Sequence, residues 1–228
     1  MSGGRKQRVA LYGGTFDPVH NGHLAVAHGL LKLFALDEVL FIPAHLAPHK
    51  RERRVASGWH RYAMLALATA DDERLRISTI ELDEPGRPYT VETLSRLRGE
   101  MGQRARLFFI MGADSWSEIT TWREWQRLLT LTDQIVVTRP GYELDSSHVG
   151  AEASARVLDL RGLDQEKLAP LIESEEEETR VYVTDAVLMD VSATEVRRAV
   201  REGREGDWRG LVPGRVAGYL KKYGLYRD

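Results

Sequence analysis

Two histidines and three glycines stand close together in residues 13–23, which read GGTFDPVHNGH. This segment follows a short apolar run at residues 9–12 and opens onto a helix-like run that ends at Leu33. Glycines let backbone N–H groups approach an anion, and the first turn of a helix adds a favourable dipole. Histidines supply hydrogen-bond donors that are neutral or charged near pH 7. The turn therefore predicts a phosphate site, suited to a triphosphate held for attack.

Other chemistry is open to this histidine pair. His20 and His23 are three residues apart, which can put both rings near one side of a helix start. A two-histidine metal site is possible, but no nearby Glu completes a metalloprotease pattern and Asp17 lies beyond Pro18. The histidines could also serve only as capping or surface residues. The preceding GGTFDP run favours the phosphate site, because an anion cradle has no evident structural use there.

A second segment able to bind phosphate is residues 191–197, VSATEVR. Ser192 and Thr194 can cap a helix whose N-terminus faces phosphate, and Arg197 can clamp phosphate oxygens in a bidentate manner. Without the N-terminal turn, a capped amphipathic helix with a surface arginine would be the favoured explanation of this pattern. Lys50, in the basic run 49–54, offers a point charge to a polyphosphate, and a solvated basic loop is the alternative.

Residues suited to a nucleoside follow the apolar run 106–111. Gly112 lets a ligand approach the backbone, and Asp114 can accept hydrogen bonds from ribose hydroxyls. Trp116, Trp122 and Trp125 come soon after, and an indole face can stack on an aromatic ring, whereas Trp125 is expected to pack in the core.

Two threonines stand at a predicted helix start, Thr90 and Thr93. Their hydroxyls can donate to a ligand, and backbone N–H groups at this position can face a carboxylate. Ordinary helix capping is the explanation favoured by the residues alone.

Strand-length apolar runs alternate with amphipathic helical patterns along the chain. The predicted strands are residues 9–12, 38–42, 75–82, 106–111, 134–138, 156–160, 180–184 and 187–191. The predicted helices are residues 23–33, 59–70, 91–98, 122–131, 194–201 and 215–223. This alternation predicts an α/β fold with a doubly wound parallel sheet. We expect one domain over residues 1–228, with a helical part at about 192–228. Residues 141–180 are less regular, and the acidic run 173–178 is expected to be a solvated loop.

Composition excludes several classes of protein. The 228 residues carry a formal net charge of −2, so no basic field argues for nucleic acid. There is no cysteine, which excludes disulfides, thiolate metal sites and a cysteine nucleophile. No apolar run approaches the roughly 20 residues that cross a bilayer, and no signal-peptide pattern follows the basic start. We expect a cytoplasmic protein that does not bind membranes.

The segment that ends in His20-x-Gly22-His23 resembles the (T/H)xGH signature of the nucleotidyltransferase superfamily. Several further segments resemble those of the nicotinate-nucleotide adenylyltransferases, and the resemblance runs from about Val9 to Tyr226. They are the proline-rich segment 42–50, YTVETL at 89–94, IMGAD at 110–114, the W-x-x-W pair, VSATEVR at 191–197 and the C-terminus. The chain departs from that pattern at Arg123, where relatives often carry an aromatic residue, and at Ala193, where a second serine is usual.

The resemblance implies a Rossmann-like nucleotidyltransferase fold that joins ATP and nicotinate mononucleotide to give nicotinate adenine dinucleotide and pyrophosphate, in NAD biosynthesis. It implies catalytic roles for His20, His23, Lys50 and Arg197. The ATP-binding residues would be Gly13, Gly14, Thr15, Phe16, His20, His23, Gly112, Asp114, Ser192, Thr194 and Arg197. The residues that bind nicotinate mononucleotide would be Thr90, Thr93, Trp122 and Lys50. Mg²⁺ is expected on the phosphates, with no metal site built by the protein.

Alternatives remain open at this point. Another acceptor, nicotinamide mononucleotide or phosphopantetheine, would suit the first signature equally well, and a non-catalytic nucleotide sensor could keep the fold. RNA binding is a third reading, because class I synthetases use a related H-x-G-H element, but the chain has no basic stripe with interleaved aromatics. A homo-oligomer is possible.

Overall fold

The computed structural model describes residues 5–45, 55–84, 86, 88–139, 141–174, 178–185 and 191–227. The chain divides into two compact units. Unit 1 comprises Met1–Tyr12, Gly29–Val39 and Pro88–Val187. Unit 2 comprises Gly13–His28, Leu40–Arg87 and Leu188–Asp228.

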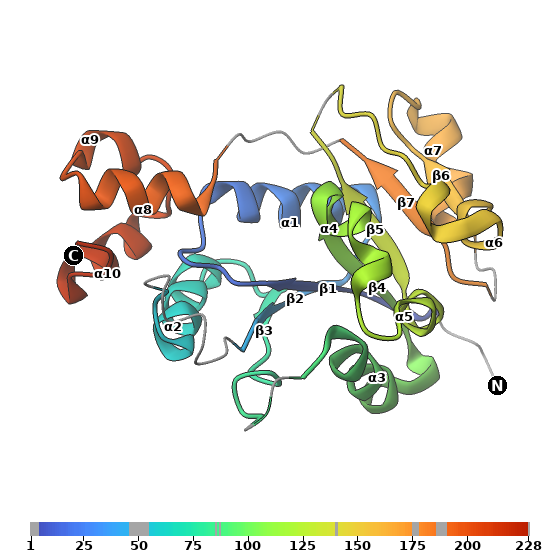
Figure 1. The fold of residues 1–228 in the computed structure, drawn as a ribbon, viewed down its shortest axis with the longest axis horizontal. Helices are drawn as coiled ribbons and strands as arrows, with labels where there is room; N and C mark the ends of the chain where they lie inside the picture. Colours follow the sequence, from blue (N-terminus) through green and yellow to red (C-terminus); the bar gives the residue numbers. More distant parts are fainter. Residues whose placement is uncertain are drawn as a thin grey trace. The chain divides into compact units, whose positions relative to one another are not determined.

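A seven-stranded sheet forms the centre of the fold (Figure 1). Its strands are β1 (Gln7–Gly14), β2 (Glu38–Pro43), β3 (Leu75–Ile77), β4 (Ala105–Gly112), β5 (Asp133–Val137), β6 (Val157–Asp159) and β7 (Val181–Thr184). The strand order is β3-β2-β1-β4-β5-β7-β6, and the pairs β1–β4, β4–β5, β5–β7 and β6–β7 are parallel. The predicted doubly wound parallel sheet is confirmed.

Register within unit 1 places the ends of its strands together. Tyr12 of β1 pairs with Ile110 of β4, and Val137 of β5 pairs with both Gly112 and Thr184. Because these strands are parallel, their carboxyl ends lie at one edge of the sheet, where open α/β sheets bind ligands.

The helices of 8 or more residues are α1 (Asn21–Leu33), α2 (Gly58–Thr69), α3 (Thr90–Met101), α7 (Gln165–Glu173), α8 (Ala193–Arg201) and α10 (Gly214–Tyr223). Shorter helices are α4 (Ala113–Ser117), α5 (Trp125–Leu131), α6 (Gly150–Ser154) and α9 (Glu205–Trp208). In unit 1, α3 and α5 pack together on one face of the strands, and α7 lies on the other face (Figure 1). Helices on both faces explain why β4 is an almost continuous apolar run.

Some predicted boundaries are wrong. The strand predicted over residues 75–82 ends at Ile77, because Ser78 and Thr79 form local turns: Ser78 Oγ accepts from Ile80 N, and Thr79 Oγ1 donates to Asp83. The helix predicted from Trp122 begins at Trp125. Most of the strand predicted at 187–191 lies outside the described residues.

Helix α7 lies in the stretch that the sequence leaves irregular. It contains Pro170, which normally argues against a helix interior. Asp164 caps its start by accepting from Lys167 N, and Leu168 and Ile172 are buried on its inner side. Capping and burial therefore stabilise a helix that the sequence pattern does not predict. The acidic run 173–178, expected to form a solvated loop, includes residues 175–177, which lie outside the described part of the chain.

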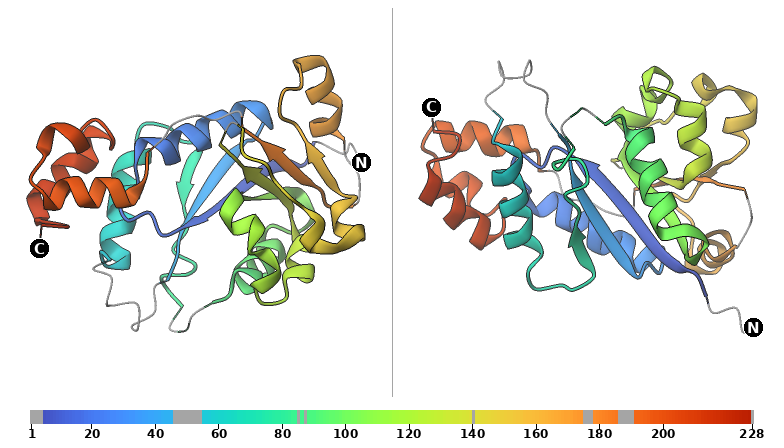
Figure 2. Two further views of the ribbon diagram at one scale, coloured as in Figure 1. Left: turned by 45° about the horizontal axis from the view of Figure 1, so that its top comes forward. Right: turned by 90° about the horizontal axis from the view of Figure 1, so that it is seen from below.

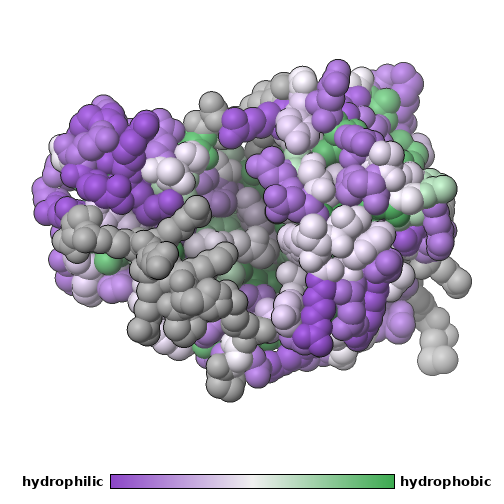
Figure 3. Space-filling model, viewed as in Figure 1, coloured by the Kyte–Doolittle hydropathy of each residue, from purple (hydrophilic) through white to green (hydrophobic). Residues whose placement is uncertain are grey.

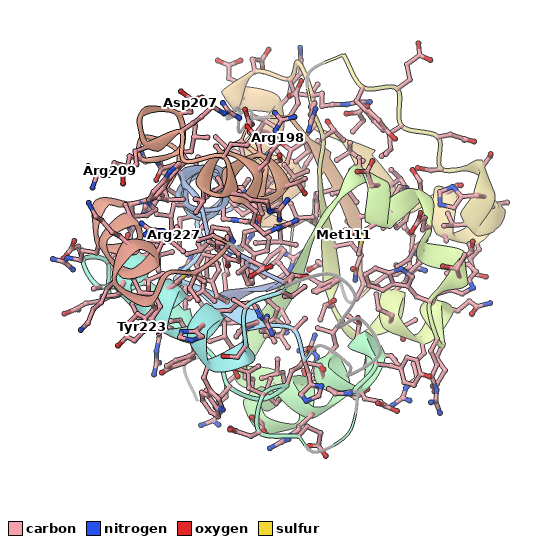
Figure 4. All side chains as sticks on the ribbon, turned by 60° about the vertical axis from the view of Figure 1, so that its left-hand side comes forward. Met111, Arg198, Asp207, Arg209, Tyr223 and Arg227 are labelled. Atoms are coloured by element: carbon pink, nitrogen blue, oxygen red, sulfur yellow. The ribbon has the colours of Figure 1, made fainter. Side chains whose placement is uncertain are left out.

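In unit 2 the last three helices lie beside α2, with α10 against it (Figure 2). Helix α8 buries Val196, Ala199 and Val200, which recur at helical spacing. The outer side of this group is hydrophilic (Figure 3). Figure 4 labels three charged residues of this group: Arg198 lies on α8, Asp207 lies on α9, and Arg209 directly follows α9.

None of the helices in the described residues is long and apolar enough to cross a membrane.

A cavity of about 1100 Å³ opens in unit 1 at the amino ends of β1, β4 and β5. Arg8 and Arg98, which line it, donate to the carbonyls of Phe34, Ile172 and Leu131, near the C-terminal ends of α1, α7 and α5. These arginines therefore satisfy helix ends at the edge opposite to the strands' carboxyl ends.

Candidate functional site

The turn between β1 and α1 is shaped by a buried phenylalanine. Phe16 has a φ of 50°, in the left-handed region, and its ring lies against Phe41 and His23, at centroid distances of 5.5 and 5.0 Å. A Cβ added at Gly14 would lie 2.9 Å from the Phe16 ring, so this position requires glycine. Phe16 is only 2% exposed. Its predicted contact with ATP thus does not involve an exposed ring, and a contact through its backbone stays a prediction.

His20 and His23 form a stacked pair, with ring centroids 3.7 Å apart. The His20 backbone N–H donates to Nδ1 of His23 at 3.2 Å, which leaves Nε2 of a neutral His23 as the protonated ring nitrogen. Burial lowers the pKa of His20 to about 4, and burial together with the nearby His20 lowers the pKa of His23 well below its usual range. Both rings are therefore neutral at pH 7 without a ligand.

Arg61 of α2, which is 1% exposed, holds the turn between β1 and α1 through hydrogen bonds. Its guanidinium donates to the carbonyls of Thr15, Ala44 and Ala56 at 2.7, 2.8 and 3.1 Å. Three loop segments therefore converge on one side chain. The sequence signal for Arg61 is an arginine on the apolar face that also carries Met64 and Leu65 of the same helix.

Helix α8 brings its N-terminus to this turn. Ser192 caps the helix by accepting from Glu195 N at 3.2 Å, so its predicted capping role is confirmed. Arg197 donates through Nη1 to the backbone oxygen of Asp17 at 2.7 Å and through Nη2 to Thr194 Oγ1 at 3.1 Å. The structure therefore unites the glycine–histidine turn with Thr194 and Arg197, although Asp17 and Arg197 are 180 positions apart in sequence.

Asp17 lies where Arg197 contacts the turn, and it is 2% exposed. Its Oδ1 accepts from Ala56 N at 3.0 Å and from the Tyr226 hydroxyl at 2.5 Å. Burial raises the pKa of Asp17, while the Tyr226 and Ala56 hydrogen bonds and the charges of Arg197 and Arg61 oppose that rise. The sequence patterns assign no role to Asp17 or Tyr226.

In unit 1, β4 runs directly into α4. Gly112 precedes the helix, and Asp114 lies exposed in its first turn. Trp116 is fully buried and donates through Nε1 to Ser146 Oγ at 3.3 Å. The core tryptophan of this region is thus Trp116, and the prediction that Trp125 fills that place is wrong, since Trp125 is partly exposed at the start of α5.

Trp122 is partly exposed and makes an edge contact with Phe109, at 6.4 Å between centroids. The neighbouring Arg123 places its guanidinium over the Tyr89 ring at 4.6 Å and lies 3.9 Å from Glu92. Residues 122–124, here called the Trp122 loop, are therefore held to the N-terminus of α3. The residue that departs from the family pattern makes this connection.

The two predicted threonines lie in the first turns of α3, where Thr93 is buried and Thr90 is partly exposed. Neither is the capping residue. Glu92 accepts from Tyr89 N at 2.8 Å, so the capping explanation favoured for the threonines is wrong. Lys50 and the rest of 46–54 lie outside the described residues.

A family model described as Cytidylyltransferase-like matches residues 11–199. A relative from Acidothermus cellulolyticus, named "Probable nicotinate-nucleotide adenylyltransferase", is 36% identical over 98% of this chain and 96% of its own length. A relative of the same name from Thermus thermophilus is 37% identical over 96% of this chain and 100% of its own length. A solved Plasmodium falciparum nicotinic acid mononucleotide adenylyltransferase, complexed with NaAD, shares the fold, with a TM-score of 0.69, 17% identity and coverage of 96% and 97% of the two chains.

Proposed function

We propose that this chain, which belongs to the nicotinate-nucleotide adenylyltransferase family, joins ATP and nicotinate mononucleotide to give nicotinate adenine dinucleotide and pyrophosphate. One observation carries the proposal from the structure itself. The neutral histidine pair and the Arg197 guanidinium converge on one strand-to-helix turn, from opposite ends of the sequence. That arrangement suits a polyphosphate, because it combines ring donors, a helix start and a fixed cation.

In the proposed reaction, an oxygen of the acceptor's phosphate attacks the α-phosphorus of ATP in line. The new P–O bond forms as the bond to the β-phosphate breaks, and pyrophosphate leaves. A phosphate is already an anion at neutral pH, so no general base is needed, and the site contributes positioning and charge stabilisation.

The predicted site residues that belong to unit 2 would act on the phosphates. Nε2 of His23, protonated in the neutral ring, would donate to the α-phosphate as charge builds on it. The remaining phosphates would be held by Thr15, His20 and Arg197 and by the α8 N-terminus with Ser192 and Thr194. Lys50 would be a further cation. The backbone at Gly13, Gly14 and Phe16 would line the phosphate path.

Unit 1 residues would bind the two nucleosides. Gly112 and Asp114, exposed where β4 meets α4, would receive the ribose of ATP. Trp122 would stack on the nicotinate ring, and the α3 start at Thr90 and Thr93 would face its carboxylate.

Mg²⁺ would accompany the phosphates. Among the described residues, no three His, Asp or Glu side chains lie close enough together to hold a metal ion. The side chains proposed to hold the phosphates are instead cationic or neutral, which fits a Mg²⁺ ion bound through phosphate oxygens and water. Bound in this way, the ion would neutralise charge on the departing pyrophosphate.

The test is a side-by-side assay of pyrophosphate release from ATP with nicotinate mononucleotide, nicotinamide mononucleotide or phosphopantetheine. We expect the acid mononucleotide to be used well ahead of the other two. Equal rates with the acid and the amide would overturn the acid preference. ATP binding without release in any arm would indicate the nucleotide sensor instead.

A further inference from the structure

The last residues of the described chain return to the nucleotide turn. Helix α10 ends at Tyr223, next to α2, and Gly224 takes a left-handed φ of 61° that reverses the chain (Figure 4). Tyr226 also has a left-handed φ, 63°, which is uncommon for a residue with a side chain. These two left-handed positions, with Leu225 N donating to Leu220 O between them, direct the Tyr226 hydroxyl to the Asp17 carboxylate.

The Asp17 carboxylate needs donors because it is buried. Oδ1 has two, the Tyr226 hydroxyl at 2.5 Å and Ala56 N at 3.0 Å. Oδ2 is buried and has no hydrogen-bond partner among the described residues, and Arg197 Nη1 lies 3.8 Å from it. A hydroxyl on a carboxylate at this short distance is a charge-assisted hydrogen bond, which stabilises the ionised form.

The ionised Asp17 in turn fixes Arg197. One guanidinium nitrogen, Nη1, is held by the Asp17 backbone oxygen at 2.7 Å and faces the carboxylate charge. Nη2 is held by Thr194. The Arg197 side chain is only 26% exposed, so these contacts decide its orientation toward the turn. If Asp17 became neutral, Arg197 would lose the negative charge that opposes its own.

We propose that Tyr226 is a positioning residue for the transfer reaction: its hydroxyl holds the Asp17 carboxylate, which holds Arg197 in place for the phosphates of ATP. This proposal rests on the polyphosphate site proposed above and adds a residue 209 positions from Asp17 that no sequence pattern assigns. In the proposed function the acceptor is held by other residues, Thr90, Thr93, Trp122 and Lys50. The contribution of Tyr226 should therefore concern ATP and spare the acceptor.

Tyr226→Phe tests this by removing one hydroxyl. Tyr219→Phe is the matched control, because the Tyr219 hydroxyl also makes a side-chain hydrogen bond, 2.9 Å to His60 Nδ1, in the same part of unit 2 but away from the turn. We expect Tyr226→Phe to weaken ATP binding about fivefold, measured by calorimetry, and to leave the KM for the acceptor unchanged. Tyr219→Phe should bind ATP as the unaltered protein does. Unchanged ATP affinity in Tyr226→Phe would overturn the proposal.

A double-mutant cycle separates positioning from a structural role. In an Arg197→Lys background, Tyr226→Phe should change ATP affinity less than about twofold, because the group through which it acts has gone. An undiminished fivefold effect there would show that Tyr226 acts only on folding, and would overturn the proposal. Should Tyr226→Phe fail to fold, Asp17→Asn, which keeps an oxygen for both donors but removes the charge, takes its place in the same cycle with the same two outcomes. Because ATP binding is measured without turnover, failure of the proposed reaction would be seen separately, as absence of pyrophosphate release in the unaltered protein.

Discussion

The backbone N–H of His20 donates to Nδ1 of His23, and the two rings stack 3.7 Å apart. The hydrogen bond fixes the tautomer of His23, and the Phe16 ring at 5.0 Å restrains its rotation. One imidazole is thus prepared as a neutral donor through Nε2. Preorganised donors of this kind favour charge that develops during phosphoryl-type transfer, because they need no rearrangement at the moment of reaction.

His23→Ala should lower kcat by ~10²-fold or more, the scale found when a transition-state donor is removed. The matched control is His28→Ala, on the same helix, whose exposed ring pairs with Asp72 at 3.3 Å. The control should keep its turnover within about twofold. Pyrophosphate release under saturating substrates measures both. A folded His23→Ala protein with full turnover would refute the assigned role.

Burial of the histidine pair predicts how stability depends on pH. The pKa of His20 is lowered to about 4, so the unfolded chain binds a proton between about pH 6.5 and 4 that the folded chain does not. The free energy of unfolding should therefore fall as the pH drops through this window, by up to about 3 kcal/mol from His20 alone. His23, lowered in the same direction, adds to that loss.

Urea denaturation at pH 7.5, 6 and 5 checks this prediction, with His20→Asn beside the unaltered chain. The variant should lose less stability on acidification. The raised pKa of Asp17 acts in the opposite direction and is common to both proteins, so the difference between them isolates the histidine. Parallel curves for the two proteins would contradict the buried, neutral His20.

Local signals in the sequence were sufficient for the elements and for part of the site. Alternating apolar runs and helical periodicity predict the parallel sheet, and Ser192 before the helical pattern predicts the cap of α8. Gly14 is needed where the chain turns tightly around Phe16. All of these depend on residues within a few positions of one another.

Contacts between distant segments could not be predicted in this way. Tyr226 meets Asp17 only because α10 ends in a left-handed reversal, and Arg61 binds three carbonyls contributed by three loops. The choice of core tryptophan failed for a related reason. Trp116 is buried because the short helix α4, which has no clear periodicity, turns it inward, and neither tryptophan of the W-x-x-W pair is fully buried.

Trp122→Ala should raise the KM for nicotinate mononucleotide about tenfold, because a stacking partner for the pyridine ring is removed. The KM for ATP should change less than about twofold. Trp59→Ala, which removes an indole that is 59% exposed on α2, is the control and should alter neither value. Initial rates across both substrate concentrations decide the matter, and equal effects on the two KM values would contradict stacking.

Arg123→Ala should act through the same loop, more weakly. The guanidinium lies 4.6 Å from the Tyr89 ring centroid, and an exposed cation–π contact contributes about 0.5–1 kcal/mol. Its loss should raise the KM for nicotinate mononucleotide roughly two- to fivefold, with kcat retained. Arg96→Ala, which breaks an exposed pair with Glu100 on α3, should leave both constants unchanged. A KM unaffected by Arg123→Ala would mean that the Trp122 loop is held by other contacts.

Arg61→Ala tests what holds the phosphate turn together. The substitution leaves the carbonyls of Thr15, Ala44 and Ala56 without this donor, and each unsatisfied buried polar group costs ~1–3 kcal/mol. We expect the free energy of unfolding to fall by about 3 kcal/mol or more in urea. Arg215→Ala, which removes an exposed pair with Asp71 at 3.1 Å, should cost less than about 0.5 kcal/mol. A loss as small as that of the control would show that water replaces the guanidinium at these carbonyls, and that the turn keeps its shape without Arg61.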